Sequence, residues 1–100
     1  MDTLKDTLIK ALEGYTGKGF NAYSYLTSSV DQQHFVVTSV GQVRGQRVVN
    51  MGLVVQFIND MIIIDQDINN KPLVDALLQA GIPRKNIILA YAGEPVPEAA

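Results

Sequence analysis

Three short segments carry residue types that serve metal, phosphate or acid–base chemistry. Residues 65–69, Asp-Gln-Asp-Ile-Asn, begin like a calcium-binding loop, because oxygen ligands stand at alternate positions. Such a loop also needs a glycine at its sixth position and a glutamate at its twelfth, where Asn70 and Ala76 stand. A loop that leads into a helix is therefore the better interpretation, and no metal site is predicted.

The run Gly17-Lys18-Gly19 resembles part of a phosphate-binding loop. A Walker loop places a hydroxyl residue directly after its lysine, whereas Gly19 follows Lys18 here. The glycine spacing also resembles a dinucleotide fingerprint, but the run follows a predicted helix and precedes a predicted strand, which reverses the required order. A plain turn is therefore predicted, with no cofactor.

His34 is the single histidine of the chain. A triad would need a serine, such as Ser39, and a carboxylate beside His34, but no nucleophile elbow supports one. The acids Asp60, Asp65 and Asp67 lie at predicted strand and turn edges, where carboxylates commonly face water. No catalytic residue is predicted, and a small ligand-binding domain or enzyme centred on His34 is kept as an alternative.

The charge balance disfavours a large nucleic-acid interface. The net charge is −2, and 18% of the residues are charged. A protein that depends on phosphate contacts needs a basic footprint, since neutralising phosphates drives its affinity. The candidate contacts for DNA or for a partner are four cations, namely Arg44, Arg47, Arg84 and Lys85. Direct DNA binding by these residues stays open as an alternative function.

Composition indicates one folded domain and is compatible with a reducing compartment. Apolar residues make up 47% of 100 residues, enough for one packed core. There is no cysteine, which excludes a disulfide scaffold and a cysteine nucleophile. The polar N-terminal residues do not form a signal peptide, and no apolar run approaches the roughly 18 residues of a membrane span. A soluble cytoplasmic protein is expected.

Periodicity predicts two helices on either side of a β-rich segment. Apolar residues of the first helix recur at spacings of three and four: Leu4, Leu8, Ala11, Leu12 and Tyr15. Asp2 or Thr3 can cap its start, and Gly14 or Gly17 can end it. The apolar stripe of the second helix consists of Leu73, Val74, Leu77 and Leu78.

Residues typical of helix ends flank the second helix. Asn69 or Asn70 is predicted to cap it, with Pro72 in its first turn. Gly81 fits the left-handed position after the helix, which places Ile82 back against Leu77.

Alternation predicts five strands, at residues 20–27, 33–40, 47–58, 61–64 and 87–92, with turns at 14–19, 28–32 and 41–45. Asn59-Asp60 is predicted to form a two-residue hairpin turn, since both residue types tolerate positive φ. The core face of the longest strand is predicted to comprise Val49, Met51, Leu53, Val55 and Phe57. The other face keeps a surplus of apolar residues, including Val48, Val54 and Ile58, which suggests a partner surface.

The predicted class is α+β, in the order α-β-β-β-β-α-β. Short turns imply a mainly antiparallel five-stranded sheet with two helices packed on it. One domain is expected over residues 1–100, with residues 93–100 as a flexible tail that contains two prolines. Self-association is expected for so small a domain with apolar strands.

Several runs together resemble the XisI-like family. They are residues 33–41 (QHFVVTSVG), residues 61–67 (MIIIDQD) and residues 77–91 (LLQAGIPRKNIILAY). Family members carry a strand that ends in a valine–glycine step, a tight hairpin, and a helix that ends in glycine, isoleucine or valine, and proline. The resemblance covers about the last two-thirds of the chain. Gln42 stands where the family often has tryptophan, and the family's aromatic and basic tail is replaced here.

The resemblance implies a function without catalytic residues. The family is named for cyanobacterial factors that control the excision of a DNA element, beside a recombinase and a nuclease-like companion, XisH. It therefore implies a non-enzymatic accessory protein, a homo-oligomer that binds a XisH-like protein partner during DNA rearrangement. It supplies no cofactor and no catalytic or metal-binding residues.

Overall fold

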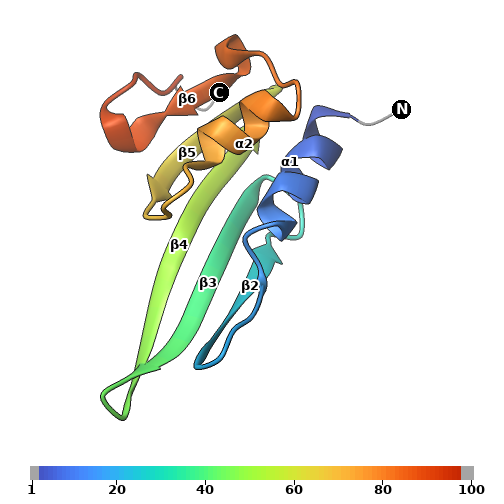
Figure 1. The fold of residues 1–100 in the computed structure, drawn as a ribbon. Helices are drawn as coiled ribbons and strands as arrows, with labels where there is room; N and C mark the ends of the chain where they lie inside the picture. Colours follow the sequence, from blue (N-terminus) through green and yellow to red (C-terminus); the bar gives the residue numbers. More distant parts are fainter. Residues whose placement is uncertain (1–2, 98–100) are drawn as a thin grey trace.

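Six strands form one sheet in which the spatial order follows the order of the chain (Figure 1). The computed structural model describes residues 3–97. Its helices and strands are α1 (Leu4–Glu13), β1 (Gly17–Lys18), β2 (Ala22–Ser28), β3 (His34–Val43), β4 (Gln46–Ile58), β5 (Met61–Asp67), α2 (Leu73–Gln79), η1 (Arg84–Asn86), β6 (Ile87–Leu89) and η2 (Ala90–Ala92). Neighbouring strands are antiparallel except β5 and β6, which run parallel because α2 connects them. The α+β class is confirmed, with six strands in place of five.

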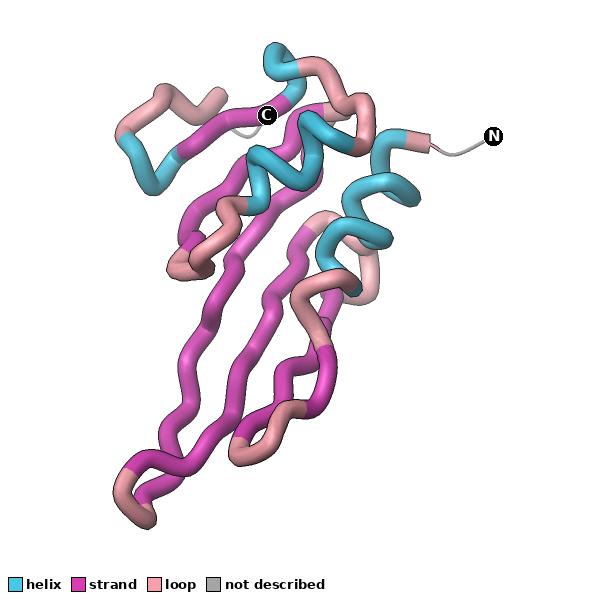
Figure 2. Tube along the Cα trace, in the orientation of Figure 1, coloured by secondary structure: helices cyan, strands magenta, loops and turns pink. Residues whose placement is uncertain are grey.

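Both helices lie on one face of the sheet, with α1 over β2 and β3 and α2 over β4 and β5 (Figures 1 and 2). The core fills the space between the helices and the sheet. Its buried members are Leu8, Leu12, Phe35, Val37, Leu53, Val55, Ile62, Ile64, Leu73, Leu77, Ile82 and Ile87. The predicted apolar stripes of both helices therefore supply the core, while Leu78 remains exposed.

Local signals at the helix ends and hairpin turns are largely confirmed. Thr3 caps α1 through a capping box, in which its hydroxyl accepts from the Asp6 N–H at 3.1 Å. Asn59 and Asp60 have φ values of 51° and 60°, as a two-residue hairpin turn requires. Gly81 has φ 95°, and the Ile82 N–H donates to the Leu77 carbonyl at 3.0 Å, which closes α2 as predicted. Asp2 lies outside the described residues.

Several predicted strand limits were wrong. The turn at 14–19 contains the short strand β1, and β2 begins at Ala22, which leaves Phe20 fully exposed. Residues 41–43 extend β3, because Gly41 pairs with Ala22 on one side and with Val48 on the other. Only Arg44 and Gly45 form the turn. The last strand ends at Leu89, since residues 90–92 wind into a 3-10 turn.

The predicted core face of β4 was wrong for the residues that precede Gly52 in the sequence. The pairing of β3 with β4 passes from Val37–Leu53 directly to Thr38–Met51, so Gly52 is an extra residue that forms a β-bulge. A bulge inverts the alternation, and Met51 and Val49 therefore leave the face that Leu53 occupies. Met51 is 52% exposed, whereas Leu53 is fully buried.

The predicted cap of α2 was also wrong. Pro72 is the N-cap, and neither Asn69 nor Asn70 caps the helix. The Asp67 carboxylate replaces them, because it accepts from the Leu73 N–H at 2.6 Å and from both the backbone and the side-chain N–H of Asn69. The Asn69 amide in turn donates to the Gly52 carbonyl at 3.0 Å, which ties this loop to the bulge. The prediction of residues 65–69 as a loop leading into a helix holds only from Ile68 onward, because Asp65, Gln66 and Asp67 belong to β5.

The Tyr15 hydroxyl joins the end of α1 to the loop before α2, donating to the Lys71 carbonyl at 2.7 Å. Burial, followed by the carboxylates of Asp67 and Asp75, raises the pKa of this hydroxyl. We expect Tyr15→Phe to lower the free energy of unfolding by about 0.5–1.5 kcal/mol, the usual net value of one hydrogen bond. Urea denaturation would measure this loss. Tyr25→Phe, on an exposed ring, is the control and should change stability little; an equal loss in both variants would contradict the assignment.

Glu94 anchors the start of the C-terminal segment. Its carboxylate accepts from the Leu89 N–H at 2.8 Å and forms an ion pair with Arg84 at 2.7 Å. The Leu89 N–H, followed by the Arg84 guanidinium, lowers the pKa of this carboxyl below its ordinary value of 4.5. Whether the rest of the tail is flexible stays a prediction, and residues 98–100 lie outside the described part.

A depressed carboxyl pKa makes this anchor dependent on pH. The charged form is favoured in the folded state, so its stabilising contribution is present above about pH 4.5 and is lost as the pH falls through the lowered folded value. We expect the protection factor of the Leu89 amide, which compares its exchange with that of an unfolded peptide at the same pH, to fall in acid, as followed by NMR. In Glu94→Gln this pH dependence of the protection factor should be lost; an unchanged pH profile in that variant would contradict this role.

Candidate functional site: the open face of the sheet

The sheet face opposite the helices is the candidate site, and we call it the open face. Cross-strand partners share a face, so the side chains paired away from Phe35 and Leu53 define it. Val36 pairs there with Val54, and Val40 with Val49. The apolar and aromatic members of the open face are Tyr23, Tyr25, Val36, Val40, Val49, Met51, Val54, Ile58, Met61, Ile63 and Ile88.

The centre of the open face is both apolar and exposed. Val49 is 55% exposed and Met51 is 52% exposed, on the longest strand of the sheet. The bulge at Gly52 places both residues there, at the level where the helix-covered core ends at Leu53. Contiguous exposed apolar side chains commonly mark an interaction surface. The sequence-based expectation of apolar residues on a second face is thus confirmed for Val54 and Ile58, while Val48 lies on the helix-covered side.

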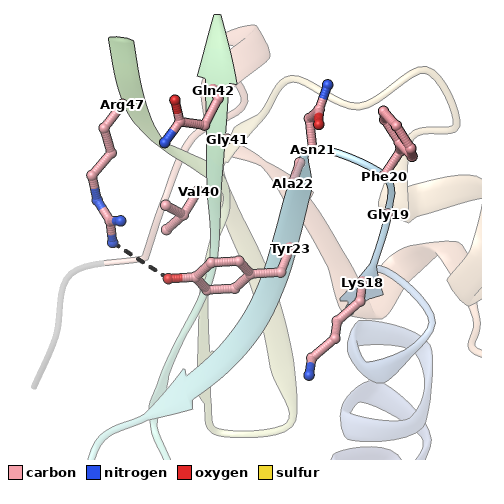
Figure 3. A pocket seen from close by; sticks show the side chains of 10 residues that line it. All are labelled: Lys18, Gly19, Phe20, Asn21, Ala22, Tyr23, Val40, Gly41, Gln42 and Arg47. Atoms are coloured by element: carbon pink, nitrogen blue, oxygen red, sulfur yellow. Dashed lines mark hydrogen bonds between the residues drawn. The ribbon is translucent and has the colours of Figure 1, made fainter. Parts of the chain in front are cut away.

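One end of the open face combines aromatic rings with cations (Figure 3). The Tyr23 and Tyr25 rings stack with centroids 6.1 Å apart, and Arg47 donates to the Tyr23 hydroxyl at 3.4 Å. Lys18 and Arg47 line a shallow pocket of about 360 Å³ beside Tyr23, together with the amides of Asn21 and Gln42. No carboxylate lines this pocket, so this end of the face is positively charged.

The four cations considered from the sequence fall into two separate pairs. Arg44 and Arg47 lie at the tip of the β3–β4 hairpin, and Arg84 and Lys85 lie in η1 at the opposite end of the sheet (Figure 1). The Arg84 guanidinium already has partners within the chain, because it donates to the Ile87 carbonyl and to the Glu94 carboxylate, both at 2.7 Å. The fold therefore places Arg47 at the candidate site, with Arg44 in the adjoining hairpin turn, and leaves the other pair apart. Their contact with DNA or a partner stays a prediction.

His34 lies at the exposed start of β3, away from both pockets. Its backbone N–H donates to the Ser29 hydroxyl at 3.0 Å, within a loop where Ser29 and the Gln33 N–H also bind Asp31 and lower the pKa of that carboxyl. Ser39 points to the helix-covered face and bonds the Ser24 hydroxyl at 2.9 Å. His34 and Ser39 therefore lie on opposite faces, so they do not form a triad.

Acidic side chains in residues 3–97 form no group of three, with or without His34, that would hold a metal ion. Asp65 lies beside Gln56, whose amide donates to its carboxylate at 2.7 Å on the open face. The Asp67 carboxylate accepts a hydrogen bond from the Leu73 N–H at the start of α2. Within the same described range, no helix has the length and apolar character to cross a membrane.

Sequence reasoning missed Lys18, Tyr23 and Tyr25 as members of the site. Tyr23 and Tyr25 are two residues apart, a spacing that places both side chains on one face of a strand. The sequence thus contained a signal for the two tyrosines. It contained none for Lys18, whose place in the pocket depends on β1, a strand of two residues.

Comparison with known proteins supports the same fold. The model of the XisI protein family matches residues 2–98. The crystal structure of the fdxN element excision controlling factor XisI from Anabaena variabilis aligns with a TM-score of 0.64 and 25% identity, covering 87% of this chain and 88% of that one. A XisI-like protein from the same organism aligns with a TM-score of 0.64 and 17% identity, covering 86% of this chain and 78% of that one.

A search of the curated proteins found no match. The family match spans nearly the whole chain, including α1 and β1, which the sequence resemblance did not reach. The chain therefore belongs to the XisI protein family.

Proposed function

We propose that this protein is a non-enzymatic accessory factor that controls the excision of a DNA element by binding another protein. Family membership supports the regulatory role, together with the likeness to a factor named for control of fdxN element excision. The observation that carries the binding role is the open face, where Val49 and Met51 stand exposed on the side of the sheet that neither helix covers (Figure 1).

A XisH-like nuclease-type protein is the proposed partner. Exposed aromatic and methionine side chains are the residue types enriched in interface centres, and Tyr23, Tyr25 and Met51 supply them here. Arg47 adds a cation at the rim of this surface. The net charge of −2 favours a protein surface over a long phosphate backbone.

Co-purification of the tagged chain with a XisH-like protein tests this proposal. The wild-type chain should retain the partner, and Met51→Asp should lose most of it, because a charge would be buried in the interface centre. Asn50→Asp is the matched control, since Asn50 precedes Met51 but is exposed on the other face. Absence of any complex with the wild-type chain, or equal loss in both variants, would refute the proposal.

Duplex DNA is the alternative ligand. If Arg44 and Arg47 contact phosphates, binding should weaken steeply with salt and fall in the Arg44→Ala and Arg47→Ala variants. Retention of DNA with this behaviour, in the absence of any protein partner, would replace the first proposal by the second. Electrophoretic mobility shifts at several salt concentrations would measure it.

A further inference from the structure

We infer that the open face pairs with the open face of a second copy, in a dimer with a two-fold axis close to Met51. This inference rests on the proposed role of the open face as a binding surface and names its first occupant. Because Met51 is the centre of both proposed contacts, a second copy and the XisH-like partner would compete for the open face.

The apolar pattern of the β3–β4 hairpin is the first argument. In the part of β4 that precedes Gly52, the side chains on the helix-covered side are Asn50 and Val48, next to Ser39 and Gly41 of β3. The open side carries the larger apolar residues Val49 and Met51. The bulge thus directs the apolar side of the hairpin away from the helices, and burial of these side chains requires a second layer on the open face.

Charge arrangement along the face is the second argument. Arg44 and Arg47 lie at the β3–β4 tip, whereas Asp60 lies at the β4–β5 turn and Asp65 on the neighbouring part of β5 (Figure 1). The open face therefore carries a cation, Arg47, toward the hairpin tip and a carboxylate, Asp65, farther toward its other end. A two-fold axis that lies between the two sheets, parallel to them and perpendicular to the strands, places Arg47 of each copy over Asp65 of the other, which makes the surface complementary to itself.

Both charge pairs require nearly the same axis. Arg44 and Asp60 stand the same number of residues before and after Gly52. Asp65 lies at the level between Val54 and Val55, so the midpoint between it and Arg47 falls near Met51. One axis beside Met51 and Gly52 consequently brings Arg44 to Asp60 and Arg47 to Asp65. The two Met51 side chains then meet at the centre.

Other modes of self-association have less support in the structure. The edge strands β1 and β6 have two and three residues, so they offer few hydrogen-bonding groups for edge-to-edge pairing. A partner of one charge sign would match only one end of the open face. A second copy matches both.

Analytical ultracentrifugation of the purified chain tests the dimer. The wild-type protein should dimerise in the micromolar to millimolar range. Met51→Asp should sediment as a monomer, while Asn50→Asp, on the other face, should dimerise as the wild type does. Circular dichroism should show that both variants are folded. A monomeric wild type, or a dimer unaffected by Met51→Asp, would overturn the inference.

Charge reversal tests the axis. Arg47→Asp and Asp65→Arg should each weaken dimerisation by about tenfold or more, since each places like charges in both symmetric contacts. An equal mixture of the two variants should regain affinity as a heterodimer, because both contacts then join opposite charges. Failure of the mixture to associate better than either variant alone would exclude this pairing.

These outcomes are separate from those of the partner experiment. The sedimentation experiments use the purified chain alone, so loss of the XisH-like role would leave a dimer intact. A monomeric wild-type chain that still binds its partner would overturn this inference and keep the proposed function.

Discussion

Replacing Leu53 by alanine is expected to lower the free energy of unfolding by about 2–5 kcal/mol. Leu53 is fully buried in the core between the sheet and the helices, so truncation removes buried apolar contacts and leaves a cavity. Total stability for a domain of this size is about 5–15 kcal/mol. The variant should therefore lose a large part of its stability, seen as a lower midpoint in urea.

Met51→Ala is the matched control, two residues earlier on the same strand. Met51 is on the open face, so this substitution should cost about 0.5 kcal/mol or less at a protein concentration low enough to keep the chain monomeric. A regular strand would give both residues the same face and similar costs. Equal losses would therefore contradict the bulge at Gly52. If Leu53→Ala fails to fold, Leu53→Val should still show a loss of about 1 kcal/mol.

Asp67→Ala is expected to cost about 2–3 kcal/mol, the second largest effect. This carboxylate accepts from the Leu73 N–H and from both N–H groups of Asn69. Hydrogen bonds to a charged acceptor contribute about 1.5–3 kcal/mol, and their loss leaves partly buried donors unsatisfied. The start of α2 should also lose protection against amide hydrogen exchange, which NMR can follow residue by residue.

Asp75→Ala is the control for charge alone. Asp75 lies exposed in the first turn of α2, so its removal should cost only the helix-dipole contribution, at most about 1 kcal/mol. Asp67→Asn should fall between the two, since an amide retains one acceptor oxygen. If Asp67→Ala and Asp75→Ala were equally destabilising, the hydrogen bonds of Asp67 would not be what holds α2.

The sequence predicted those parts of the fold that depend on a few neighbouring residues. The Asn59-Asp60 turn and the Gly81 helix end both follow from which residue types accept positive φ. The capping box at Thr3 likewise needs only residues three apart. Each of these features depends on residues only a few positions apart, and together they predicted the order of the helices and strands.

The errors share a physical cause, because each depends on a contact that reaches beyond one stretch of alternating residues. The bulge at Gly52 arises from the pairing of β4 with β3 and from Asn69, which binds the Gly52 carbonyl. The cap of α2 comes from Asp67, six residues before the N–H that it binds. The shared pocket of Lys18 and Arg47 requires four strands, β1 to β4, to be in place. Alternation within a single segment carries no information on such contacts.

The order of the strands has a consequence for how the chain reaches this structure. Because each of the first four strands pairs with the next along the chain, most of the sheet requires only the closure of short loops, which costs little chain entropy. Only β6 must cross over α2 before it can pair with β5. We therefore expect the antiparallel strands to assemble early and rapidly, with α2 and β6 docking last and limiting the folding rate.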